Sequence, residues 1–111
     1  MLKIYVVAEQ LVKVVMPVID AIERKDPDLA RQARKAITST PLNIAEGSCQ
    51  SGKRRDFHYR VALGSAREAW AAVRVAHAAR YIGPPPEPVM ALFDQVIGTM
   101  HKCVHRPPHS A

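Results

Sequence analysis

The chain has 111 residues, a formal net charge of +6 and two cysteines. This length is enough for one domain with its own core, and the widely separated Cys49 and Cys103 argue against a disulfide-linked secreted scaffold. Charged residues interrupt the apolar first segment at helical spacing. We therefore expect neither a signal peptide nor a membrane span, and we place the protein in the cytoplasm.

The positive charge is concentrated in the middle of the chain. Residues 1–30 contain four Lys/Arg and five Asp/Glu, residues 31–80 contain ten and three, and residues 81–111 contain two and two. The central segment therefore has a net charge of +7 by itself (ten minus three). Such asymmetry indicates an anionic partner.

The first segment has the apolar spacing of an amphipathic helix, which we predict over about residues 3–24. Pro17 lies inside this helix and is expected to kink it. The residues predicted to face the core are Ile4, Ala8, Leu11, Val15, Val18 and Ile22.

A second helix is predicted to begin at Pro27, with Asp26 as its N-cap, and to end at Gly47. The connection is short, so this helix should run antiparallel to the first. Its predicted inner stripe is Leu29, Ala33, Ala36, Ile37, Thr40 and Ile44, and its predicted outer residues are Arg31, Arg34 and Lys35.

A third and longest helix is predicted over residues 54–81, with Ser51 as a plausible N-cap. Apolar residues occupy most of its circumference, except for one narrow stripe of arginines seven residues apart: Arg60, Arg67 and Arg74. A helix that is apolar on many sides has to be covered on more than one. We therefore expect Trp70 and Val73 to contact another copy of the protein. The alternative is an alanine-rich exposed helix, since alanine tolerates water.

A fourth helix is predicted from Pro88 to about His105, after a proline-rich spacer. Four helices with short connections define an all-α fold, an antiparallel up-down-up-down four-helix bundle. We expect one domain over residues 1–105 and a disordered C-terminal tail over residues 106–111.

Two sequence motifs resemble a known family. The run from Asn43 to Gly47, the aromatic Phe57, and the later stretch from Ala62 to Ser65 followed by Glu68 are similar to the signature of a bacterial four-helix bundle family encoded in ribosomal RNA intervening sequences. The accessory variability determinant of diversity-generating retroelements is a more distant relative of that family. The resemblance implies a homopentameric ring of bundles with a basic surface, nucleic-acid binding and no catalysis.

Four polar residues flank the corner between the second and third helices: Asn43, Glu46, Ser65 and Glu68. Paired carboxylates can serve as acid and base. Buried polar groups are normally hydrogen-bonded, however, so a structural clamp between the two helices is the favoured interpretation. Gly64 would let the helices approach closely.

The histidines near the C-terminus are candidate metal ligands. His101 and His105 are one helical turn apart, but Cys103 lies off their face, and His109 falls in the tail. We predict no metal site and no cofactor. No phosphate-binding glycine loop, catalytic triad order or zinc-ribbon spacing is present, and we predict no enzyme activity.

The predicted nucleic-acid-binding residues are clustered cations on the second helix and at the start of the third: Arg31, Arg34, Lys35, Lys53, Arg54, Arg55 and Arg60. Phe57 is expected to be buried, which leaves His58 and Tyr59 as local stacking partners and makes sequence-specific reading of bases unexpected. The predicted function is non-enzymatic binding of RNA or DNA by a homo-oligomer. The alternative is an oligomeric scaffold or accessory subunit for a partner protein, for example a retroelement reverse transcriptase.

Overall fold

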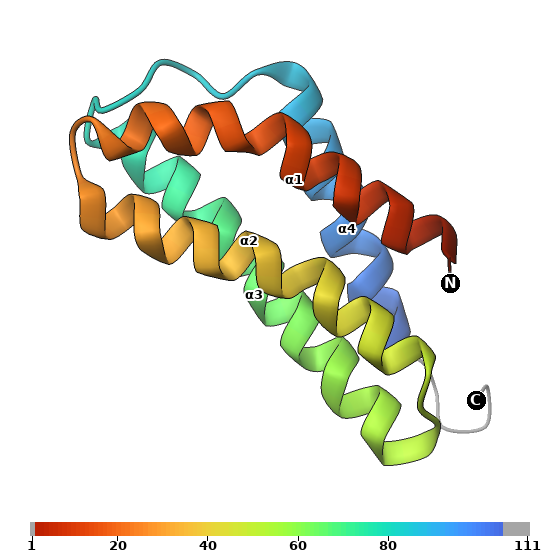
Figure 1. Cartoon of the computed structure of the whole chain (residues 1–111). Helices are drawn as coiled ribbons and strands as arrows, with labels where there is room; N and C mark the ends of the chain where they lie inside the picture. Colours follow the sequence, from red (N-terminus) through yellow and green to blue (C-terminus); the bar gives the residue numbers. More distant parts are fainter. Residues whose placement is uncertain (1, 106–111) are drawn as a thin grey trace.

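The computed structural model describes residues 2–105, and these contain four helices and no strands. The helices lie lengthwise beside one another around a shared core (Figure 1). Their bounds are α1 Leu2–Glu23, α2 Pro27–Ser48, α3 Gly52–Ala78 and α4 Glu87–Val104. The Cα atoms extend over 46 × 23 × 20 Å, so the molecule is about twice as long as it is wide. The predicted tail, residues 106–111, lies outside the described residues.

The turn between α1 and α2 is built as the sequence predicts. Asp26 is the N-cap of α2, and its Oδ1 accepts a hydrogen bond from the backbone N–H of Leu29 at 3.0 Å. Pro27 takes the first helical position, where its missing N–H costs nothing. Both α1 and α2 continue through an internal proline, Pro17 and Pro41 respectively.

The core stripe of α1 differs from the prediction at one point. Ile4, Leu11 and Ile22 are buried as expected, but Val18 is only half-buried and Ile19 takes its place at 0% exposure. Val18 and Ile19 lie three and four residues after the buried Val15, and both spacings fit the helical repeat. The spacing alone therefore allowed either residue to face the core.

The face of α3 that packs on the core is lined mainly by alanines, which permit a close approach to α2. The buried residues are Tyr59, Ala62, Leu63, Ala66, Ala69, Ala72, Val73 and Ala76. The opposite face is exposed and carries the predicted arginine stripe, and no other helix among the described residues covers it. Apolar residues do occur on the exposed face, but they are interspersed with cations.

α3 ends three residues earlier than predicted, in a hydrogen-bonded cap. The N–H of Tyr81 donates to the carbonyl of Ala76 at 2.9 Å, and that of Arg80 donates to His77 at 3.0 Å. This pair of bonds defines a Schellman motif, which needs a left-handed residue after the helix. Arg80 fills that position with φ of 67°.

Gly47 does not end α2, because the helix continues to Ser48. A β-carbon added to Gly47 would lie 2.6 Å from both Cδ1 and Cε1 of Tyr59 on α3. Gly47 therefore lets α2 and α3 approach closely at this point. Gly64, which was expected to have this role, is exposed, and a β-carbon there would meet nothing within 4 Å.

Candidate nucleic-acid interface

The seven predicted binding residues do not form one surface. α2 and α3 are antiparallel and joined by the three residues Cys49, Gln50 and Ser51 (Figure 1). Lys53 is in the first turn of α3, whereas Lys35 is 13 residues before the end of α2, about 20 Å along the helix. The predicted patch is thus divided into two groups at different levels of the molecule.

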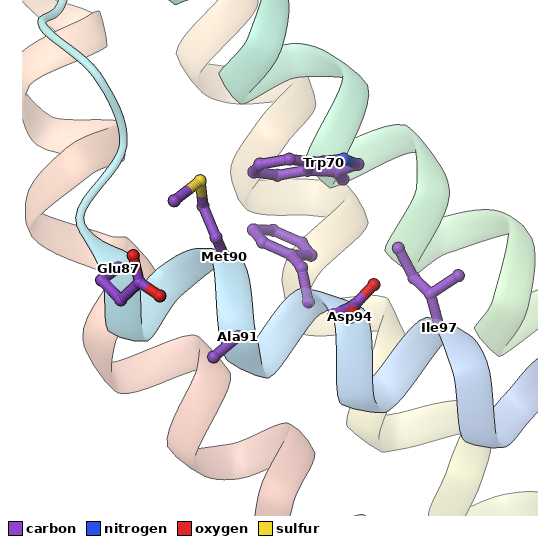
Figure 2. Close-up of a pocket in the computed structure, with 7 residues that line it drawn as sticks. Trp70, Glu87, Met90, Ala91, Asp94 and Ile97 are labelled. Atoms are coloured by element: carbon purple, nitrogen blue, oxygen red, sulfur yellow. The ribbon is translucent and has the colours of Figure 1, made fainter.

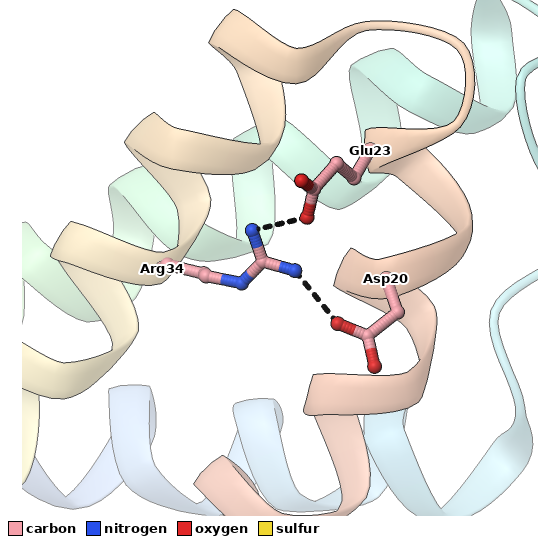
Figure 3. A network of polar contacts seen from close by, with 3 residues as sticks. All are labelled: Asp20, Glu23 and Arg34. Carbon is pink, nitrogen blue, oxygen red and sulfur yellow. Dashed lines mark hydrogen bonds and ion pairs between the residues drawn. The ribbon is translucent and has the colours of Figure 1, made fainter.

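Arg34 is occupied by the protein's own carboxylates. Its Nη2 donates to Asp20 Oδ1 at 2.7 Å, and its Nη1 lies 2.6 Å from Glu23 Oε1 (Figure 3). Hydrogen bonding to Asp20 and then to Glu23 raises the pKa of the guanidinium above its usual value. Both carboxylates belong to α1, so Arg34 links α2 to α1 rather than facing a ligand. Its assignment as a nucleic-acid-binding residue stays a prediction, since the side chain is 35% exposed but already paired.

The rest of this first group is weakly cationic. Arg31 forms an exposed ion pair with Asp28 at 3.3 Å, one turn earlier on α2. Lys35 is exposed and makes no ion pair within residues 2–105. With three acidic partners beside two arginines, this end of the molecule offers little net positive charge.

The strongest positive feature is a line of cations along the outer face of α3. It consists of Lys53, Arg60, Arg67 and Arg74, which are all exposed and spaced seven residues apart, about 10.5 Å per step. We call these four residues the α3 ridge. Lys53 and Arg60 are among the predicted binding residues, whereas Arg67 and Arg74 of the same stripe are not. Their seven-residue spacing was the signal that could have identified them.

Two ridge residues have polar partners in the protein. Arg60 Nε donates to Asp56 Oδ2 at 2.8 Å within α3. Arg67 Nη2 lies 3.2 Å from His101 Nδ1, so the ridge approaches α4 at this point. Lys53 and Arg74 make no ion pair within the described chain. Exposed pairs of this kind are worth little and leave the cations available to an anion.

Further cations gather where α3 begins. Arg54 is exposed and Arg55 is half-buried, both beside Lys53 in the first turn. Ser51 is the N-cap by backbone geometry, but its side chain makes no capping hydrogen bond. The positive end of the helix dipole adds to the field of these side chains.

The exposure of the two aromatic residues in this region is the reverse of the prediction. Phe57, predicted to be buried, is 60% exposed, and Tyr59, predicted as a stacking partner, is 8% exposed. Two residues that are two positions apart on a helix point about 200° from each other, so only one of them can face the core. Tyr59 is the one that faces the core, because its ring packs against Gly47 of α2.

The predicted clamp between α2 and α3 exists with altered membership. Asn43 Nδ2 donates to the Ser39 carbonyl at 3.0 Å, and Asn43 Oδ1 lies 3.1 Å from His58 Nδ1. The hydroxyls of Ser39 and Ser65 are 3.0 Å apart. Asn43 and Ser65 were predicted, whereas Ser39 and His58 were missed.

The two predicted clamp carboxylates stay outside this network. Glu46 and Glu68 are exposed and enter none of the hydrogen bonds or ion pairs found among residues 2–105. Including them in the clamp is therefore wrong.

Trp70 and Val73, the predicted interface residues, have different environments. Val73 is fully buried in the protein's own core, so its assignment to an interface is wrong. Trp70 is half-buried and packs on Phe93 of α4, with ring centroids 5.1 Å apart and planes tilted by 40°. It borders an open groove of about 490 Å³ between α3 and α4, which also exposes Met90 and Ile97 (Figure 2).

Two further properties concern metals and membranes. His101 and His105 stack with centroids 4.1 Å apart, but within the described chain no three His, Cys, Asp or Glu side chains gather as metal ligands. His109 lies outside the described residues. None of α1 to α4 is both long and apolar enough to cross a membrane.

The fold and this surface define an all-helical protein in which the solvent-facing side of α3 carries a line of cations. The sequence model of the family described as 23S rRNA-intervening sequence protein matches residues 1–99. The chain belongs to this family, which confirms the resemblance seen in its motifs. No curated protein and no solved structure matches it.

Proposed function

We propose that this protein is a non-enzymatic homo-oligomer that binds the phosphate backbone of RNA or DNA, largely without sequence specificity. The observation that carries the proposal is the α3 ridge, whose four exposed cations extend over about 31 Å of helix. Binding of phosphates needs only Lys and Arg displayed on one surface, because released counterions supply the free energy. Membership of a family named for an rRNA intervening sequence is compatible with such a partner.

The charge distribution supports the ridge over the first basic group. The three cations of that group are balanced by three carboxylates on α1 and α2, so the group has no net charge: Arg31, Arg34 and Lys35 against Asp20, Glu23 and Asp28. α3 carries six Lys/Arg against two Asp/Glu. An anionic polymer is therefore attracted to α3 and to the turn that precedes it.

The test is a gel-shift titration over several salt concentrations, with Lys53→Gln and Arg74→Gln made singly and together. Each lost phosphate contact should lower the slope of log affinity against log salt by roughly one, with every RNA or DNA sequence affected alike. Lys25→Gln, in the turn between α1 and α2, is the matched control and should leave the slope unchanged. Absence of any retardation by the wild-type protein at low salt would reject nucleic-acid binding and favour a protein-scaffold function.

The homo-oligomeric part of the proposal rests on the groove between α3 and α4. A half-exposed tryptophan beside Met90, which is 38% exposed, is the type of anchor that protein interfaces use. A second apolar strip lies between α1 and α2, where Leu42 is 67% exposed beside Tyr5 and Val12. Two different apolar surfaces on one protomer suit the head-to-tail contacts of a closed ring, for which we propose a pentamer.

Light scattering tests this assembly. The mass should be a multiple of 12.3 kDa that persists on dilution. Leu42→Asp and Met90→Asp should each reduce it, because each would place a charge in a contact between copies. A wild-type mass of one chain at every concentration would reject the ring.

A further inference from the structure

Phe57 is the most exposed aromatic side chain in the described chain. It is 60% exposed, while the tyrosines, Trp70 and Phe93 are buried or half-buried. An exposed phenylalanine leaves apolar area in water, which is unfavourable by itself. The residues around Phe57 indicate what kind of partner would cover its ring.

Phe57 lies among cations on the outer face of α3. Lys53 is one turn before it and Arg60 is one turn after it, and both are exposed. Arg54, three residues before Phe57, is also exposed. Asp56 is the only acidic residue of this segment, and Arg60 already binds it at 2.8 Å. The ring is thus surrounded by net positive charge.

The Phe57 ring has an aromatic neighbour, His58. The His58 ring packs against it edge to face, with centroids 5.2 Å apart and planes at 76°. His58 is itself held by Asn43, whose Oδ1 accepts from Nδ1 at 3.1 Å, because the amide nitrogen of Asn43 is used by Ser39. The α2–α3 clamp therefore positions the ring that contacts Phe57.

We propose that Phe57 is a stacking platform for an unpaired base, with Lys53, Arg54 and Arg60 binding the phosphates on either side of that nucleotide. The partner class is single-stranded RNA or DNA, or an unpaired loop. Aromatic rings and neighbouring cations are the combination by which proteins bind single strands irrespective of sequence. The bases of a duplex are stacked on each other and cannot cover the ring.

A second copy of the protein is the less suitable occupant. Phe57 and Trp70 are 13 residues apart, which places them about 140° from each other around α3, so Phe57 does not face the proposed assembly groove. The centres of protein interfaces are depleted in lysine, whereas the exposed Lys53 lies one helical turn from Phe57.

This inference rests on the proposed nucleic-acid binding, and the experiment separates the two. The probes are a fluorescently labelled 20-nucleotide RNA of mixed sequence and the same strand annealed to its complement. Phe57→Ala should weaken binding of the single strand by roughly five- to hundredfold, the range found for loss of one base-stacking contact. Duplex binding should stay within about twofold, and the salt slope should not change, because no phosphate contact is lost.

Two further variants make the test specific. Val75→Ala is the matched control, because Val75 is 54% exposed and lies 18 residues, or five turns, from Phe57 on the same face of α3. It should bind both probes as the wild type does. Phe57→Trp should restore single-strand affinity, since it keeps a stacking surface.

Several outcomes would overturn the inference. Equal single-strand affinity of Phe57→Ala and the wild type would do so while leaving the proposed function intact. So would an equal loss for the duplex, or a changed mass in light scattering, which would place Phe57 between copies. A wild-type protein that binds neither probe at low salt would reject the proposed function as well.

Discussion

Gly47 of α2 lies against the ring of Tyr59 of α3, with no space between them for a side chain. A β-carbon on Gly47 would be 2.6 Å from two ring carbons and 3.2 Å from the β-carbon of His58. The glycine of the family-like run from Asn43 to Gly47 thus has a packing function. It leaves room for the Tyr59 ring between α2 and α3.

Gly47→Ala should therefore destabilise the protein even though alanine favours helix. Overpacking of this kind costs about 1 to 3 kcal/mol, which exceeds the gain of about 1 kcal/mol from replacing glycine within a helix. Urea denaturation measures the change. Gly64→Ala is the control: its β-carbon meets nothing, so it should stabilise the protein by up to about 1 kcal/mol. Equal effects of the two variants would contradict this account.

Arg80→Gly should increase the free energy of unfolding. Arg80 has φ of 67° at the end of α3, a conformation that costs an L-residue with a β-carbon about 1 kcal/mol and glycine almost nothing. Part of this gain is offset, because glycine has a more flexible unfolded chain. Thermal melting should rise by a few degrees. A lower melting temperature would mean that the Arg80 side chain makes a stabilising contact.

Arg34→Ala should lower the melting temperature, because Asp20 and Glu23 would lose their common partner. Both carboxylates lie in the last turns of α1, where the negative end of the helix dipole disfavours them. Arg31→Ala is the control, since its pair with Asp28 is exposed on both sides and should contribute little. The difference between the two variants should shrink in high salt. A salt-independent difference would indicate lost packing of the arginine stem instead.

Trp70→Ala should destabilise the protein by about 2 to 3 kcal/mol, less than a fully buried tryptophan because its indole is half-exposed. The contact with Phe93 is the main loss. If the groove also holds another copy, the same variant should reduce the mass measured by light scattering. A stability loss without a mass change would restrict Trp70 to a role within the protomer.

The helices themselves were largely predictable because their signals are local. Asp26 and Pro27 specify a helix start through one hydrogen bond and one missing N–H, and both act within three residues. The number and order of helices, the start of α2 and the extent of α4 follow from such signals. The end of α3 was mispredicted, since an arginine takes the left-handed position at which glycine is usual.

The site was less predictable because it depends on how the helices face one another. Arg34 and Asp20 are 14 residues apart, and only the packing of α1 on α2 brings them within 2.7 Å. The choice between Phe57 and Tyr59 as the buried aromatic likewise depends on the register of α2 against α3. Residue spacing gives the angle between two side chains on a helix, but not which of them faces the core.

The seven-residue spacing of the α3 ridge would also determine the path of a nucleic-acid strand bound as proposed. Seven residues make slightly less than two turns of an α-helix, so each cation is displaced by about 20° from the one before it. From Lys53 to Arg74 the line winds by about 60° as a shallow left-handed spiral, and it nears α4 where Arg67 meets His101. A strand that contacts all four cations has to curve with this spiral. A stiff duplex lying straight across α3 would reach only neighbouring cations, whereas a flexible single strand could follow the whole ridge.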